Sequence, residues 1–166
     1  MITTNRLTLG SIREQDFDAL MSIFKNETVK ATYMVPDLTT RDAEIKLFET
    51  VRALSEREGR YVWGIYLNDA LIGLINDTEI HGKIIEMGYA LHPAYHNQGY
   101  ATEAFSAVID HLFANGFEEI LAGAFAENTA SLRVMEKCGM TRTNMTAKIE
   151  YRGIRHPCIY YSIKAK

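Results

Sequence analysis

The 166-residue sequence has few of the features that mark secreted, membrane-spanning or metal-binding proteins. Its two cysteines, Cys138 and Cys158, are too few for a disulfide scaffold and lack the spacing of a zinc site. No stretch approaches the roughly 20 apolar residues needed to span a bilayer, and residues 1–10 contain no apolar segment of a secretory signal. These absences favour a cytoplasmic protein that makes no use of a membrane.

Positive charge is also scarce, because 18 lysines and arginines stand against 21 acidic residues and give a net charge of −3. No basic cluster is long enough to follow a phosphate backbone, which excludes a dedicated nucleic-acid-binding protein. The five histidines include no H-E-x-x-H motif, so we expect no metal site.

Hydrophobic periodicity predicts one α/β domain over residues 1–166. Strands are expected at 6–12, 61–67, 71–78, 84–92, 120–125, 140–149 and 155–163. Helices are expected from a capping box at Ser11 and Glu14 to Phe24, and over 44–54, 101–113 and 128–137. A largely antiparallel start followed by alternating strands and helices indicates a mixed sheet covered by helices.

The segment from His92 to Glu103 joins an expected strand to the N-terminus of an expected helix, with Gly99 at the bend. Helix N-termini present N–H groups and partial positive charge, so a pyrophosphate would fit there. Gly99 permits close approach of the backbone, and Ala101 keeps the next turn free of bulk. The segment lacks the glycines of a dinucleotide fingerprint and the Lys-Ser or Lys-Thr pair of a P-loop. The alternative is that Gly99 serves only a tight turn.

This segment resembles the acetyl-CoA loop of the GNAT superfamily of N-acetyltransferases, which reads Gln or Arg, two residues, Gly, one residue, then Gly or Ala. Gly99 and Ala101 match that pattern, whereas His96 stands where Gln or Arg is usual. Residues 99–104 and 86–89 are similar to the Rim-type branch, which contains protein N-terminal acetyltransferases.

A second block, Asn128 to Ser131 followed by Glu136 to Met140, is similar to the family's Asn-x-x-Ser and Glu-Lys-x-Gly-Phe pattern. By this resemblance, Asn128 and Ser131 face the thioester end of the cosubstrate. The physical alternative is that Asn128 caps a helix and Ser131 satisfies backbone groups in its first turn. Both roles are compatible.

The resemblance covers nearly the whole chain and implies a single N-acetyltransferase domain. Its fold would be a mixed, mostly antiparallel sheet of about seven strands, splayed like a V and flanked by four helices. It implies acetyl-CoA as cosubstrate and no metal. The residues it places against coenzyme A are Ala90, Leu91, His92, His96, Asn97, Gln98, Gly99, Tyr100, Ala101, Thr102, Asn128 and Lys137.

The reaction implied is transfer of an acetyl group to a primary amine that attacks the thioester directly. The Rim-type resemblance favours a protein N-terminal α-amine and points to Glu150 as base. Glu86, on the small-residue face of the central strand, is a second candidate, and Ser131 could stabilise the leaving thiolate. For each carboxylate the alternative is a solvated strand residue.

Two other functions remain open at this point. A polyamine or other small-amine acetyltransferase would differ mainly in the acceptor pocket, which we expect residues 26–58 to shape, with Tyr33 as a contact. A non-catalytic regulatory module that binds coenzyme A would keep the loop around Gly99 without needing Ser131 or Glu150. The sequence is compatible with a monomer or a homodimer.

Overall fold

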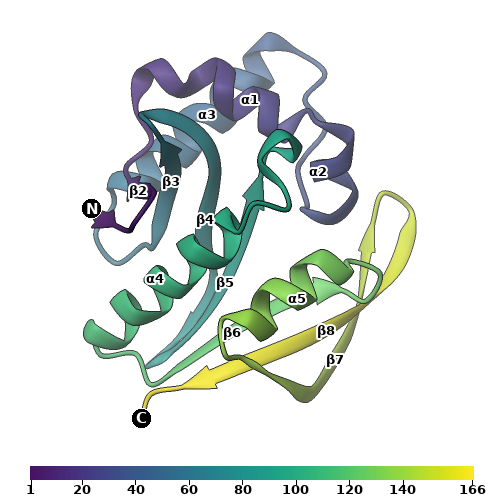
Figure 1. The fold of residues 1–166 in the computed structure, drawn as a ribbon. Helices are drawn as coiled ribbons and strands as arrows, with labels where there is room; N and C mark the ends of the chain where they lie inside the picture. Colours follow the sequence, from purple (N-terminus) through teal and green to yellow (C-terminus); the bar gives the residue numbers. More distant parts are fainter. The chain divides into compact units, whose positions relative to one another are not determined.

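The computed structural model describes all 166 residues, and its eight strands form one sheet in the order β1-β2-β3-β4-β5-β6-β8-β7 (Figure 1). The strands are β1 (Ile2–Thr3), β2 (Leu7–Gly10), β3 (Val62–Leu67), β4 (Ala70–His81), β5 (Ile84–Leu91), β6 (Glu119–Phe125), β7 (Thr141–Tyr151) and β8 (Ile154–Lys164). The α-helices are α1 (Phe17–Phe24), α2 (Glu27–Thr32), α3 (Arg41–Glu56), α4 (Tyr100–Ala114) and α5 (Thr129–Lys137).

The predicted mixed α/β fold is confirmed, with one strand and one helix more than expected. β5 and β6 run parallel, whereas the pairs β1–β2, β2–β3, β3–β4, β6–β8 and β7–β8 are antiparallel. The chain divides into two compact units, residues 1–76 with 89–104 and residues 77–88 with 105–166. None of the helices is both long enough and apolar enough to cross a membrane.

The core of the first unit lies where α1 and α3 pack on strands β3 and β4. Leu20 and Ile23 of α1 are fully buried together with Leu74 of β4, and Phe48 of α3 completes the cluster. The hairpin predicted between β3 and β4 is confirmed, since residues 68 and 69 both have positive φ and close a tight turn. Periodicity of apolar residues therefore identified the presence of both helices and both strands, though not all of their ends.

The predicted start of the first helix is wrong. No capping box forms between Ser11 and Glu14, because the Ser11 hydroxyl donates a hydrogen bond to the carbonyl of Ser55 in α3. The N-terminal signal comes instead from Asp16, whose carboxylate accepts the backbone N–H of Arg13 at 2.7 Å. A short 3₁₀ helix, η1 (Glu14–Asp16), precedes α1. The N-cap of α1 is therefore Asp16, and the helix begins at Phe17.

Helix α2 was not predicted. It has only six residues and one buried side chain, Val29, which is too little periodicity to detect. Its N-cap is Asn26, whose side-chain oxygen accepts the N–H of Thr28 at 2.9 Å.

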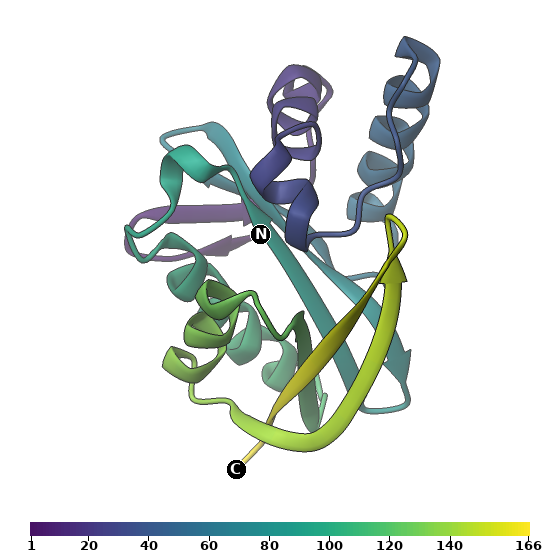
Figure 2. The same ribbon diagram turned by 90° about the vertical axis from the view of Figure 1, so that its right-hand side faces the viewer.

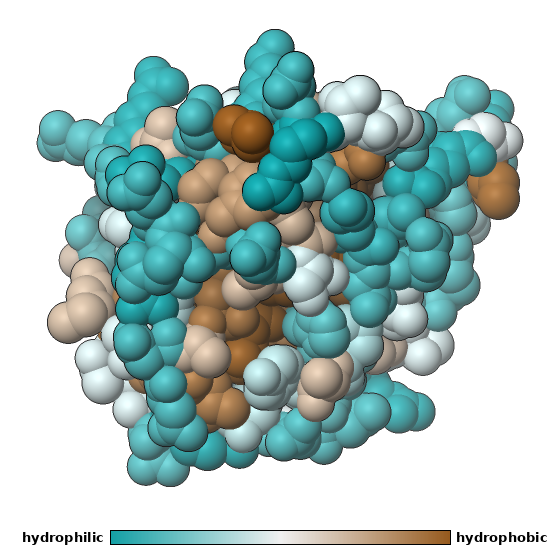
Figure 3. All heavy atoms as spheres, turned by 90° about the horizontal axis from the view of Figure 1, so that it is seen from above, coloured by the Kyte–Doolittle hydropathy of each residue, from teal (hydrophilic) through white to brown (hydrophobic).

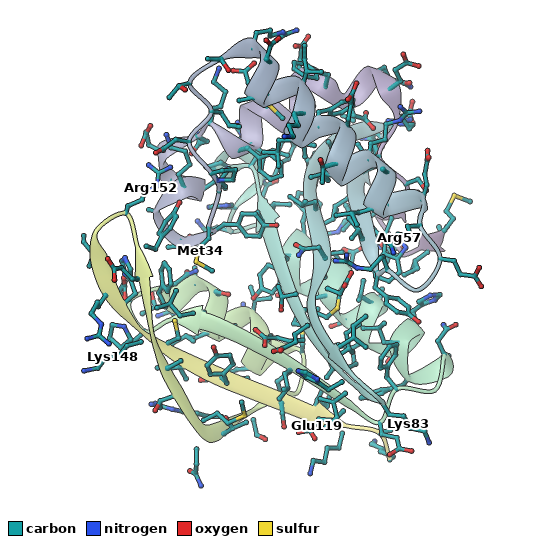
Figure 4. All side chains as sticks on the ribbon, turned by 180° about the vertical axis from the view of Figure 1, so that it is seen from behind. Met34, Arg57, Lys83, Glu119, Lys148 and Arg152 are labelled. Atoms are coloured by element: carbon teal, nitrogen blue, oxygen red, sulfur yellow. The ribbon has the colours of Figure 1, made fainter.

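The second unit contains the long two-stranded ribbon of β7 and β8 (Figure 2). Arg152 and Gly153, both with positive φ, close its tip as predicted, and Arg152 lies at that tip while Lys148 lies along β7 (Figure 4). Helices α4 and α5 end before Gly116 and Gly139, whose φ values of 91° and 82° confirm the predicted C-terminal signals.

Candidate active site

In the first unit, the loop from β5 to α4 is folded on itself by its own polar side chains. The Nδ1 atom of His92 accepts the N–H of Ala94 at 3.1 Å and caps a short 3₁₀ helix, η2 (Pro93–Tyr95). His96 Nε2 lies 2.8 Å from the carbonyl oxygen of Leu91, and the side-chain amide of Gln98 donates to the Ala94 carbonyl. The histidine that departs from the family pattern therefore braces the loop.

The backbone at the end of this loop is left-handed, with φ of 58° at Asn97 and 80° at Gly99. The first helical bond of α4 runs from the N–H of Glu103 to the carbonyl of Gly99 at 3.0 Å. The amides of Tyr100 and Ala101 therefore open a helix of 15 residues and have no acceptor within it. Together with the helix dipole they form the kind of site that binds phosphate oxygens.

An ion pair that sequence reasoning missed fixes the start of α4. Glu103 accepts three hydrogen bonds, from the Thr4 hydroxyl at 2.6 Å, from the Arg6 N–H at 2.8 Å and from Arg6 Nε at 2.6 Å. Burial would raise the pKa of Glu103, but these hydrogen bonds and the Arg6 charge together lower it. We call Thr4, Arg6 and Glu103 the Arg6 clamp.

The Arg6 clamp also reaches the loop itself. Arg6 Nη1 donates to the Gln98 carbonyl at 2.9 Å, and its guanidinium carbon lies 4.4 Å from the centre of the Tyr100 ring. Glu103 lies 97 positions after Arg6 along the chain, so no local pattern could reveal the pair. The only signal in the sequence is an acidic residue in the first turn of the helix.

The first unit also contains a pocket of about 130 Å³. Its lining is predominantly apolar and consists of Phe24, Tyr33, Met34, Val35, Pro36, Leu47, Val51, Leu54, Arg60, Val62, Leu74 and Asn76. Over half of these positions fall within residues 26–58, the range predicted to shape the acceptor pocket. On the face that carries α1 and α3, hydrophobic residues gather within a rim of hydrophilic ones (Figure 3).

The polar groups of this pocket are few. The Tyr33 hydroxyl donates to the side-chain oxygen of Asn76 at 2.8 Å, and burial raises the pKa of Tyr33. Arg60 is the one charged residue among the lining residues, and none of them carries a carboxylate. The pocket therefore offers no negative charge to a cationic group.

In the second unit, strand alternation puts Glu86 on one face of the sheet. Glu86 pairs with Leu121 of β6, and Tyr160 of β8 lies on the same face, two residues along, over Gly123. Helix α5 lies on the other face, because the hydroxyl of Tyr161 donates to Glu136 of that helix. We call the first of these surfaces, with Glu86, Gly123, Phe125, His156, Cys158 and Tyr160, the Glu86 face.

Burial raises the pKa of Glu86, and the neighbouring charge of Glu79 raises it further, while a hydrogen bond from Thr78 opposes both. Glu150, the other candidate base, is exposed on β7 opposite Arg155. The adjacent pair, Ile149 and His156, points to the Glu86 face, so alternation directs Glu150 away from it. The structure therefore separates the two candidate carboxylates.

The structure does bring Asn128 and Ser131 together. Asn128 is the N-cap of α5, and its side-chain oxygen accepts the N–H of Ser131 at 3.2 Å, as the physical interpretation predicted. Lys137, also expected to contact coenzyme A, is the exposed last residue of α5. The remaining residues expected there, 90–102, all belong to the first unit.

Neither cysteine has the environment of a nucleophile. Burial raises the pKa of Cys138, whose sulfur accepts a hydrogen bond from the Ser106 hydroxyl at 3.4 Å. Burial, with the charges of Glu127 and Glu86, also raises the pKa of Cys158. Both groups therefore stay in the thiol form at neutral pH. No group of three or more histidine, cysteine or acidic side chains is placed to hold a metal ion.

Comparison with known proteins identifies the family. Residues 6–141 match the acetyltransferase (GNAT) domain family. The uncharacterized N-acetyltransferase YoaA of Bacillus subtilis (strain 168) is 30% identical, over 98% of this chain and 96% of YoaA.

Solved structures show the same fold at lower identity. The ribosomal α-N-protein acetyltransferase RimL in complex with coenzyme A superimposes with a TM-score of 0.85 at 18% identity, covering 97% of this chain and 95% of RimL. A chimera of the spermidine N-acetyltransferase SpeG of Vibrio cholerae and hSSAT gives 0.80 at 17% identity, covering 96% of both chains. Through its domain match and its relatives, the chain belongs to the GNAT family and is an N-acetyltransferase.

Proposed function

We propose that the chain transfers the acetyl group of acetyl-CoA to the α-amine at a protein N-terminus, by direct attack while both substrates are bound. The observation that supports acetyl-CoA as the cosubstrate is the conformation at the start of α4. There Gly99 has a left-handed backbone, and the amides of Tyr100 and Ala101 open a long helix. The diphosphate of coenzyme A has the charge that such a site attracts. The Arg6 clamp holds this backbone in place before any ligand arrives.

The other residues proposed to contact coenzyme A fit this role in different ways. Asn97 and Gln98 are exposed in the loop, whereas Ala90 and Leu91 have buried side chains and would offer backbone groups. His92, Thr102, Asn128 and Lys137 complete the proposed set.

The lining of the apolar pocket supports a peptide acceptor. A polyamine carries several positive charges, and its recognition requires carboxylates that the pocket lacks, while Arg60 would repel it. A peptide N-terminus carries one amine, with a pKa of about 8, so roughly a tenth of it is uncharged at pH 7. A lysine side chain, with a pKa of about 10.4, would need far more help to lose its proton.

Side chains of the protein would assist both the departure of the sulfur and the attack of the amine. The Ser131 hydroxyl is proposed to donate a hydrogen bond to the departing sulfur, with Asn128 fixing the first turn of α5 beneath it. Among the carboxylates, Glu86 and Glu150 are the candidates for receiving the proton of the amine. The raised pKa of Glu86 brings it nearer to the value of an efficient base at neutral pH.

An assay of free-thiol release from acetyl-CoA tests the proposal. The acceptors are peptides with alanine or serine N-termini, polyamines and aminoglycosides, and the control is each peptide with its N-terminus already acetylated. We expect release above background with the free peptides and none with the blocked ones. Release with polyamines alone would establish the small-amine alternative. Binding of coenzyme A by calorimetry without any turnover would establish the non-catalytic module.

A further inference from the structure

The bend that follows β6 is anchored to β8 beside His156. The N–H of Ala126 donates to the carbonyl of Pro157 at 2.8 Å, and the N–H of Asn128 donates to the carbonyl of Phe125 at 2.9 Å. The bend leads directly into the first turn of α5, which carries Ser131. Whatever binds at that turn therefore lies close to the start of β8.

Two contacts fix the imidazole of His156 at this bend. Its ring stacks on Phe125, with centroids 4.1 Å apart and planes inclined by 10°. Its Nδ1 atom lies 2.6 Å from the carboxylate oxygen Oε1 of Glu127. The His156 side chain is 13% exposed, whereas that of Glu127 is 53% exposed. The ring is thus packed and oriented, while the carboxylate supports it from the solvent side.

The pair sets the proton arrangement of the ring. The pKa of Glu127 is lowered, first by a hydrogen bond from its own backbone and then by His156, so the carboxylate stays ionised at neutral pH. A carboxylate can only accept, which assigns the proton of neutral His156 to Nδ1. The lone pair is then on Nε2, and the structure shows no partner for that atom.

We infer that His156 is the general base of the acetyl transfer and that Glu127 is its positioning residue. This inference rests on the proposed function, in which an amine attacks the thioester of acetyl-CoA directly. The nitrogen lone pair of the amine forms the C–N bond, the electron pair of the C–S bond leaves with sulfur, and Nε2 takes one N–H proton. The imidazolium then returns this proton to the sulfur, which yields amide and free thiol.

Imidazole suits this step better than either carboxylate. The ordinary pKa of imidazole, about 6.5, is closer to neutral pH than the ordinary pKa of a glutamate, about 4.3, and efficient bases titrate near the working pH. His156 also shares the Glu86 face, whereas Glu150 points to the opposite one.

Several other titratable or charged groups surround the ring and would influence its titration. The Tyr151 ring of β7 lies 6.3 Å away, and Arg152 lies over Tyr151 at 5.3 Å. Cys158 of β8 donates to the His156 carbonyl, and Glu86 of β5 and Tyr160 of β8 lie on the same face.

Three variants test the inference in the thiol-release assay. In His156→Gln we expect kcat to fall about 100-fold, and in Glu127→Gln about 10-fold, with small changes in KM. The wild-type kcat should decline on the acid side of neutral pH, and His156→Gln should lack this acid limb of the pH profile. In Glu127→Gln the limb should move to lower pH, because the carboxylate no longer favours the imidazolium. In His156→Ala, added imidazole should restore part of the activity.

A matched control is available in the same unit. His81 forms a similar pair with Glu79 at 2.7 Å, but both side chains are largely exposed, at 72% and 60%. His81→Gln should leave kcat and its pH dependence unchanged.

The outcomes separate the two proposals. If the wild type acetylates no amine, the proposed function fails. If the wild type is active while His156→Gln keeps its kcat and its acid limb, only the inference fails. If His156→Gln does not fold, as judged by circular dichroism, Glu127→Gln decides the question. Because Glu127 is exposed, its substitution should leave the fold intact. If the acid limb of the pH dependence of kcat does not move in Glu127→Gln, the inference is overturned.

Discussion

Gly73 of β4 leaves room for the backbone of β5 in the first unit. A Cβ atom at this position would lie 2.5 Å from the carbonyl oxygen of Ala90 and 3.2 Å from the Cα atom of Leu91. Backbone atoms cannot move aside as the end of a flexible side chain can, so the strands would have to separate. The residues that would be displaced are two of those proposed to contact coenzyme A.

We therefore predict that Gly73→Ala is harmful in two ways. The free energy of unfolding should fall by about 2–3 kcal/mol, the cost of overpacking a close contact. Affinity for coenzyme A should also fall, because Ala90 and Leu91 move. Urea denaturation measures the first effect and titration calorimetry the second.

Gly10→Ala is the matched control, since no atom lies within 4 Å of a Cβ added there and Gly10 is also in a strand. Its stability should change by no more than about 0.5 kcal/mol, with coenzyme A affinity unchanged. Equal effects in the two variants would show that the close approach at Gly73 has no energetic weight.

At the scale of elements, the Arg6 clamp ties the first turn of α4 to the segment between β1 and β2. Because the folded state lowers the pKa of Glu103, its carboxylate stabilises the fold above its unfolded pKa of about 4.3. That contribution is lost as the pH falls below this value. Since Arg6 is 40% exposed, we expect a modest total effect.

We predict that Glu103→Gln lowers the free energy of unfolding by about 1–2 kcal/mol at pH 7. The difference from wild type should shrink as the pH falls below about 4.3, because the carboxylate is protonated there in the unfolded chain and only at lower pH in the folded one. Urea denaturation between pH 3 and 7 measures it. Glu49→Gln, an exposed substitution on α3, should show no such dependence. A penalty for Glu103→Gln that stays constant over this range would contradict an ionic role for the clamp.

Elements with local signals were predictable, and those held by distant contacts were not. Helix α5 shows both its cap at Asn128 and its terminal Gly139 in the sequence, and the structure confirms both. Helix α2 is too short to show a period. The pair of Glu127 and His156 joins the end of one strand to another strand, so no spacing in the sequence could reveal it.

For the whole molecule, the bend at Gly99 was predictable because it depends on neighbouring residues, whereas the Arg6 clamp that holds the loop in place was not. The full lining of the proposed acceptor pocket was not predictable, because helices α1 and α3, the segment after α2 and strands β3 and β4 line it together. Its lack of carboxylates becomes visible only once these elements are folded. The prediction of the cosubstrate therefore rests on the sequence, whereas the argument for the acceptor depends on tertiary structure.

Binding of coenzyme A should stabilise the whole folded chain, and this effect gives a further test. A ligand that binds only the folded state stabilises it by about 2.7 kcal/mol at 100 times its Kd. For a chain of this length we predict that Tm rises by about 5–10 °C. The measurement is calorimetric unfolding with and without coenzyme A.

Gly99→Ala should lose most of this rise, because Gly99 has a φ of 80° and the substitution shifts the amides that begin α4. The same substitution at Gly116, where φ is 91° and no atom lies within 4 Å, imposes a similar backbone cost of about 1–2 kcal/mol away from the loop. Gly116→Ala should therefore lower Tm without ligand and keep the full rise with it. If both variants keep the rise, the diphosphate does not bind at the start of α4.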